Sequence, residues 1–162
     1  MLQSFRKNKR DANIKIKMIV VIRIKGIVDI PKDVKRTLDM LKLRKKHACV
    51  MLSEKPEILG MLKKVQSYVA FGNLDKETFK LLLLKRGKLL GDNPLEIKEE
   101  KLDSFIEDFF NSKAKLSDIK LKPFFRLHPP KGGFKKSTKI MWPKGILGNH
   151  HNDINKLIIR ML

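Results

Sequence analysis

A regular pattern of apolar and polar positions first appears in MIVVIRIKG, residues 18–26. Val20, Ile22 and Ile24 fall on one side of a period-two alternation. The other side is partly basic and consists of Ile19, Val21, Arg23 and Lys25. Such an alternation predicts a β-strand that is buried on one side and partly basic on the other.

Helical and strand patterns then alternate up to residue 75. Pro31 opens a predicted helix, because proline suits the first helical turn, and Val34, Leu38 and Leu41 recur at helical spacing. The other predicted elements are a strand in HACVMLS (47–53), a helix over 57–68 and a short strand in YVAFGNLD (68–75). The resulting order, β-α-β-α-β, predicts a layered unit with its helices on one face of the sheet.

The pattern changes after Asp75. KETFKLLLLKRGKLLG predicts a short helix that ends at Gly87 or Gly91. NPLEIKEEKLDSFIEDFF predicts an acidic helical stretch, with seven acids in residues 92–108. NDINKLIIRML predicts a last helix that is capped by Asn152 or Asp153. Its expected inward-facing residues are Ile154, Leu157, Ile158 and Met161.

The stretch FFRLHPPKGGFKKSTKIMWPKG, residues 124–145, combines prolines, glycines and lysines with aromatic residues at both ends. The aromatic residues are expected to anchor it to the body of the protein. Pro129 and Pro130 fix φ and stiffen the chain, whereas Gly132 and Gly133 allow a tight turn and a close approach to another backbone. We therefore expect a basic loop over 123–145 that contacts a partner.

The chain is organised into three expected regions. Residues 1–17 carry six basic residues against one acid and predict a tail that is disordered when unbound, although Met18 could also be the initiator. Residues 18–75 form the predicted core. Residues 76–162 form an extension with helices, the basic loop and the last helix.

The charge balance points to a polyanionic partner. The chain has 37 Lys and Arg against 17 Asp and Glu, which gives a net charge of +20. Such a charge favours a phosphate-rich partner. Nucleic acid is preferred to a membrane surface, because the basic helix over 31–44 is also needed for core packing and no apolar run is long enough to span a bilayer. Lysine outnumbers arginine 29 to 8, which indicates contact with the phosphate backbone more than with base edges.

Motifs of enzymatic chemistry are absent from the sequence. GGFKKSTK has residue types of a phosphate-binding loop at the wrong spacing, and no nucleophile, zinc-protease or dinucleotide motif is present. The single Cys49 is interpreted as a buried thiol in a strand. His150 and His151 could bind a metal, but a polar turn is the preferred interpretation. We expect no catalysis, no cofactor and no small-molecule substrate.

Five stretches of the chain, taken in order, closely resemble the archaeal form of the large-subunit ribosomal protein L-thirty family, called L-seven in eukaryotes. They are MIVVIRIKG, TLDMLKLRKKHACVML, GMLKKVQSYVAFGNLD, LLKRGKLLG and FRLHPPKGGF. The resemblance covers about residues 18–162. It implies an α+β fold, with a ferredoxin-like core of three antiparallel strands and two helices on one face. It also implies a non-catalytic, cytoplasmic monomer in the large ribosomal subunit that binds ribosomal RNA and neighbouring ribosomal proteins.

Candidate RNA-binding residues are basic side chains on the strand, loop and helix ends. They are Arg23, Lys25, Arg44, Lys45, Lys46, Arg86, Lys88, Arg126, His128, Lys131, Lys135, Lys136, Lys139 and Lys144. The run at 43–47 could equally be cations at a helix C-terminus. A nucleic-acid-binding regulator that acts outside the ribosome, on the same scaffold, remains the alternative function.

Overall fold

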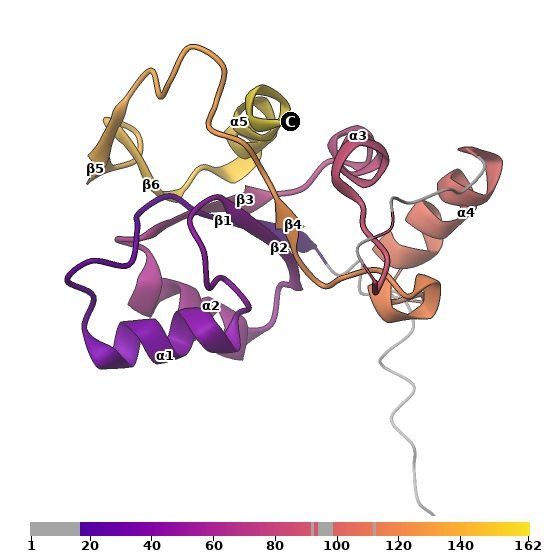
Figure 1. The fold of residues 1–162 in the computed structure, drawn as a ribbon, viewed down its shortest axis with the longest axis horizontal. Helices are drawn as coiled ribbons and strands as arrows, with labels where there is room; N and C mark the ends of the chain where they lie inside the picture. Colours follow the sequence, from indigo (N-terminus) through magenta and orange to yellow (C-terminus); the bar gives the residue numbers. More distant parts are fainter. Residues whose placement is uncertain (1–16, 92, 94–98, 112) are drawn as a thin grey trace, which may run out of the picture.

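The computed structural model describes residues 17–91, 93, 99–111 and 113–162 (Figure 1). The predicted basic tail lies outside these residues, apart from Lys17. The strands are β1 (Met18–Arg23), β2 (Ala48–Ser53), β3 (Val69–Asn73), β4 (Phe125–Arg126), β5 (Ser137–Met141) and β6 (Gly145–Asn149). The α-helices are α1 (Lys32–Met40), α2 (Pro56–Val65), α3 (Lys76–Arg86), α4 (Glu99–Phe110) and α5 (Ile154–Met161), and 3-10 turns occur at Leu116–Ile119 and His151–Asp153.

The sheet has an antiparallel centre of three strands. β1 lies between β2 and β3, and its Val21 is opposite both Val50 and Phe71. The sheet is larger than expected, however, because β4 adds antiparallel to β2 and β6 adds parallel to β3. With β5 outside β6, the order is β4-β2-β1-β3-β6-β5. The described fold is therefore α+β with a six-stranded mixed sheet, and the expectation of only three strands was wrong.

Helices cover both faces of the sheet: the two helices of the core lie on one face, as expected, and helices of the extension cover the other. In Figure 1, α1 and α2 lie on one side of the sheet and α3 and α5 on the other. Ile19 and Val21 pack towards Leu38 of α1 and Leu62 of α2. The opposite face packs against apolar residues of α3, α4 and α5. β1 is thus a central strand that is buried on both sides, so the partly basic open face predicted for it does not exist.

The side chain of Arg23, which was expected on an open face, is buried and hydrogen-bonded inside the protein. Only 2% of Arg23 is exposed, and its guanidinium is surrounded by main-chain carbonyl groups. Its Nε donates to the carbonyl of Lys25 at 3.0 Å, and Nη2 donates to that of Gly26 at 2.8 Å. Its Nη1 donates to the carbonyls of Leu43 and Arg44 at 2.7 and 2.8 Å. Arg23 therefore joins the loop after β1 to the loop before β2.

The other predicted elements are close to the observed ones. α1 begins directly after Pro31, and α3 ends at Gly87, whose N–H caps the helix at the carbonyl of Leu83. The four residues of α5 that were expected to face inward are all buried. Cys49 is also buried, as predicted, and burial raises the pKa of its thiol. Within the part of the chain that the structure describes, no helix is long and apolar enough to cross a membrane.

The segment 123–145 is not one loop, because β4 and β5 lie within it. These strands are at opposite edges of the sheet, so the chain between them crosses from one edge to the other (Figure 1). Gly132 and Gly133 both have φ of +73°, which supports the predicted turn. Arg160 of α5 holds this turn by donating to the carbonyls of Lys131 and Gly133 at 3.2 and 2.6 Å.

Candidate nucleic-acid interface

A basic groove runs between three segments that are distant in sequence. These are the loop between α1 and β2, the C-terminal end of α3, and β4 with the residues that follow it. The groove has a volume of about 950 Å³. Its lining residues, which define the basic groove, are Lys45, Lys46, Leu84, Lys85, Arg86, Gly87, Lys88, Lys122, Phe124, Arg126, Leu127 and His128.

Strand pairing places the side chains of β4 in the groove. Phe125 is opposite Cys49 in β2, and only 1% of it is exposed because it points into the core. Side chains alternate along a strand, so Phe124 and Arg126 point away from that core. The Arg126 guanidinium lies 5.4 Å from the centroid of the Phe124 ring, a cation–π arrangement. This short strand therefore presents an aromatic ring and a cation side by side.

The α1–β2 loop supplies the facing cations by a similar alternation. Leu41 and Leu43 are buried, whereas Lys42 between them and Arg44 after them are exposed and project outward. Arg44 approaches Asp39 of α1 at 3.9 Å, but 79% of the Arg44 side chain is exposed. Such an exposed pair is weak, and Arg44 can still meet another anion.

Arg86 has a partly structural role in the groove. It is half-buried, and its Nη2 donates to the main-chain oxygen of Leu162 at 2.7 Å. Its buried Nε has no hydrogen-bond partner. Arg86 thus lines the groove and also ties the end of α3 to the end of α5.

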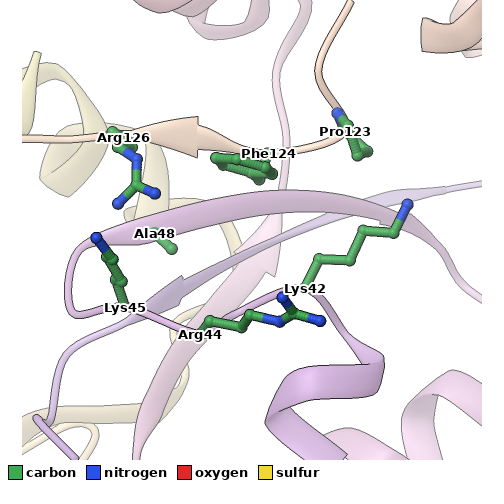
Figure 2. A pocket seen from close by; sticks show the side chains of 7 residues that line it. All are labelled: Lys42, Arg44, Lys45, Ala48, Pro123, Phe124 and Arg126. Carbon is green, nitrogen blue, oxygen red and sulfur yellow. The ribbon is translucent and has the colours of Figure 1, made fainter. Parts of the chain in front are cut away.

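A smaller aromatic pocket opens beside the groove and shares Lys45, Phe124 and Arg126 with it (Figure 2). The pocket encloses about 400 Å³. Its lining residues are Lys42, Arg44, Lys45, Ala48, Pro123, Phe124 and Arg126. In Figure 2, Arg126 and Phe124 come from one segment, and Lys42, Arg44 and Lys45 come from the loop that faces it. Among the described residues that line the groove or the pocket, none is acidic.

A second basic cluster surrounds Trp142 and His150. The Nζ of Lys136 lies 3.7 Å from the centroid of the Trp142 ring and donates to the carbonyl of Pro143 at 2.8 Å. The rings of Trp142 and His150 are 4.3 Å apart between centroids. A hollow of about 280 Å³ beside the two rings is lined by both of them and also by Lys135, Lys156, Arg160 and Asp153. Trp142 therefore anchors the end of the crossing segment, as the sequence predicted.

His150 is buried beneath this cluster, and the expected polar turn follows it at His151–Asp153. Its Nε2 contacts the carbonyl of Ile146, and 3% of the residue is exposed. Burial lowers the pKa of His150 from its ordinary value of 6.5, and Lys136 lowers it further, while the contact with the Ile146 carbonyl opposes this shift. Unfolding exposes an imidazole that binds a proton more readily.

We therefore expect a pH dependence of stability that originates at His150. Because its folded pKa lies below the unfolded one, its contribution is complete above about pH 6.5 and is lost as the pH falls below that value. Urea unfolding at about pH 7.5 and about pH 5 measures this loss. His150→Gln should reduce the difference between the two conditions, whereas His151→Gln, at an exposed neighbour, should leave it unchanged. An equal difference in both variants would contradict the assignment.

The structure gathers seven of the predicted residues in the basic groove or its aromatic pocket. These are Arg44, Lys45, Lys46, Arg86, Lys88, Arg126 and His128. Five others lie outside the groove: Lys131, Lys135 and Lys136 on the crossing segment, Lys139 in β5 and Lys144 between β5 and β6. Lys25 is half-buried, with its Nζ 5.4 Å from the centroid of the Tyr68 ring, and Arg23 is internal.

Three groove or pocket cations were missed by the sequence analysis: Lys42, Lys85 and Lys122. Lys42 and Lys85 adjoin the predicted Arg44 and Arg86, and the alternation of Leu41 with Leu43 was a signal for Lys42. Lys122 lines the groove because the segment that contains it pairs with the residues that follow α3, where its N–H donates to the carbonyl of Lys88 at 2.9 Å. No comparable pattern near residue 122 indicates that pairing.

The fold and the groove define a small α+β protein with a cationic surface. A family model described as ribosomal protein L30p/L7e matches residues 19–69. A large ribosomal subunit protein uL30 from Archaeoglobus fulgidus is 41% identical over 89% of this chain and 99% of its own length. Proteins of the same name from Methanocorpusculum labreanum and Methanococcus vannielii are 36% and 39% identical, over 89% and 88% of this chain and 99% and 97% of their own lengths. The chain therefore belongs to the L30p/L7e family, whose archaeal members include these uL30 proteins.

Proposed function

We propose that this protein is a structural constituent of the large ribosomal subunit that binds ribosomal RNA through the basic groove. The observation that carries the proposal is the convergence of three separate segments on one surface whose charged lining residues, within the described chain, are all cationic. Relatives that match almost their whole length to this chain are named as large-subunit proteins. Non-enzymatic RNA binding in the cytoplasmic ribosome, beside other ribosomal proteins, is the function that suits this surface.

The groove favours the phosphate backbone of folded RNA. Lysine and arginine at its edges neutralise phosphates without reading sequence, and the exposed lysines of the crossing segment extend the cationic surface past α5. The core at 18–75 and the extension at 76–162 both contribute, since Lys45 and Arg126 lie on opposite walls. The proposal therefore includes a ferredoxin-like core at 18–75 and an extension at 76–162 that bind the RNA together.

Salt dependence of RNA binding tests the groove. A triple variant, Arg44→Gln/Lys45→Gln/Arg126→Gln, should bind in vitro transcribed large-subunit RNA more weakly. The slope of log affinity against log salt should fall by about one unit per lost phosphate contact, hence by roughly two to three units. The matched control, Lys32→Gln/Lys63→Gln/Lys64→Gln, removes the same charge from exposed positions of α1 and α2. Equal slopes for the two variants would mean that net charge, and not the groove, determines binding.

Sedimentation separates the ribosomal function from that of a regulator outside the ribosome. The protein should migrate with intact large subunits in a sucrose gradient of cell extract and remain with them at moderate salt. If the large subunits are intact but the protein stays at the top of the gradient, away from them, the structural function is contradicted and the regulator is favoured.

A further inference from the structure

The aromatic pocket has a composition that phosphate binding alone does not require. Its floor is apolar and consists of buried Ala48 with half-buried Pro123 and Phe124, whereas its rim carries cations. Apolar surface in contact with water is unfavourable, so this floor favours an occupant with an apolar face. Resting on the proposed RNA binding, we infer that the pocket receives the base of one unpaired nucleotide while the rim cations hold its flanking phosphates.

The Phe124 ring is positioned to stack on such a base. It projects from the segment before β4 towards the loop that carries Lys45, and the opening between them is visible in Figure 2. The Arg126 guanidinium lies over the ring, 5.4 Å from its centroid. A base on Phe124 would therefore have a planar cation beside it, as unstacked RNA bases often have.

The shape of the site favours an unpaired base over a duplex. The pocket encloses about 400 Å³, which is within the range of ligand pockets, whereas a paired base has both faces covered by its neighbours in the stack. The site is also held before binding. Ala48 and Arg126 are opposite each other in the β2–β4 pair, and Arg23 fixes the carbonyls of Leu43 and Arg44. A bound base would not have to order these walls.

Continuity with the basic groove favours RNA over an acidic protein segment. Lys45, Phe124 and Arg126 line both hollows, so a backbone that follows the groove passes the mouth of the pocket. Beyond them the groove adds cations from α3 and from Lys46, which suits the regular spacing of phosphates. An apolar side chain of a protein would occupy the pocket alone and leave this run of cations without a counterpart.

Chemical footprinting tests the inference on the full chain bound to in vitro transcribed large-subunit RNA. Hydroxyl radicals report the protected backbone, and base-specific reagents for all four nucleotides report unpaired bases. We expect the wild-type protein to protect at least one unpaired base inside its backbone footprint. Phe124→Leu should make that base reactive, retain the backbone footprint and weaken binding roughly tenfold. Phe124→Tyr, which keeps the ring, should retain the protection.

The controls separate this inference from the proposed function. Phe105→Leu, at a half-buried aromatic residue of α4, should leave the base protected. A backbone footprint with identical base reactivities for wild type and Phe124→Leu would overturn the base pocket alone. No backbone footprint with the wild-type protein would overturn RNA binding and the pocket together.

Crosslinking gives a readout that does not depend on the stability of the Leu variant. Phe124→p-benzoylphenylalanine, in reconstituted large subunits, should crosslink to a nucleotide within the footprint. A crosslink to a neighbouring protein in place of RNA would overturn the inference and assign the pocket to a protein side chain.

Discussion

Replacing Arg23 by methionine is expected to destabilise the protein by on the order of 4 kcal/mol, because several charge-assisted hydrogen bonds are lost together. Methionine fills a similar volume but leaves the carbonyls of Lys25, Gly26, Leu43 and Arg44 without their donor. Buried acceptors without partners are costly, and the two loops that the guanidinium joins would separate. Urea unfolding measures the effect as a lower midpoint with an unchanged slope.

Two further variants define the cause of the Arg23 effect. Arg36→Met removes an arginine from an exposed position of α1 and should change stability by less than about 0.5 kcal/mol. Arg23→Lys retains the charge, but a single ammonium cannot reach acceptors on both loops, so its stability should fall between wild type and Arg23→Met. Wild-type stability in Arg23→Met would show that water replaces the guanidinium.

Gly72→Ala is the second substitution with a large expected effect, about 3 kcal/mol of destabilisation through overpacking. Gly72 is buried in β3 opposite Val20, where the chain of the 3-10 turn before α5 crosses the strand. A Cβ at this position would meet the carbonyl oxygen of His151 at 2.2 Å and Cγ2 of Ile154 at 2.9 Å. The first of these atoms is main chain, so relief requires that the turn and α5 move away from the sheet.

Gly60→Ala is the matched control, because the same substitution at this position should raise the free energy of unfolding and not lower it. Gly60 lies inside α2, and no atom is within 4 Å of the position of its Cβ. Alanine there should stabilise the helix by roughly 0.5–1 kcal/mol. Thermal or urea unfolding of both variants measures the pair. A neutral Gly72→Ala would mean that α5 does not pack closely on β3.

The elements that could be predicted from sequence are those with strong local patterns. The helices with regular apolar stripes and the three central strands were found within a few residues of their observed ends. β4, β5 and β6 were missed because they are short or rich in glycine and pair with distant strands. Gly148, for example, pairs with Ala70 of β3, and nothing near residue 148 indicates that partner.

Arg23 shows a different limit of sequence analysis. Alternation correctly placed it on the same side of β1 as Ile19 and Val21, but alternation does not say which faces are covered. α1 and α2 cover this side, and the extension covers the other, so both are interior. A basic residue on a central strand was therefore a sign of a buried hydrogen-bonding role.

The candidate groove was predicted in its residue types but not in its grouping. Basic runs near residues 45, 86 and 126 were each visible in the sequence. Their convergence depends on two pairings: β4 adds to β2, and the segment before β4 pairs with the residues that follow α3, through the Leu89–Leu121 bridge. Both pairings are long-range, which is why Lys122 was missed.

The position of the late strands has a consequence for the chain during its synthesis. β2 and β3 are the outer strands of the antiparallel centre, and their edges are covered by β4 and β6, which leave the synthesising ribosome long afterwards. An uncovered strand edge offers unpaired N–H and C=O groups to other chains and promotes aggregation. Residues 18–75 already carry 12 Lys and Arg against 6 Asp and Glu, and this positive charge, which suits an RNA partner, also makes such nascent sheets repel one another until the C-terminal strands close both edges.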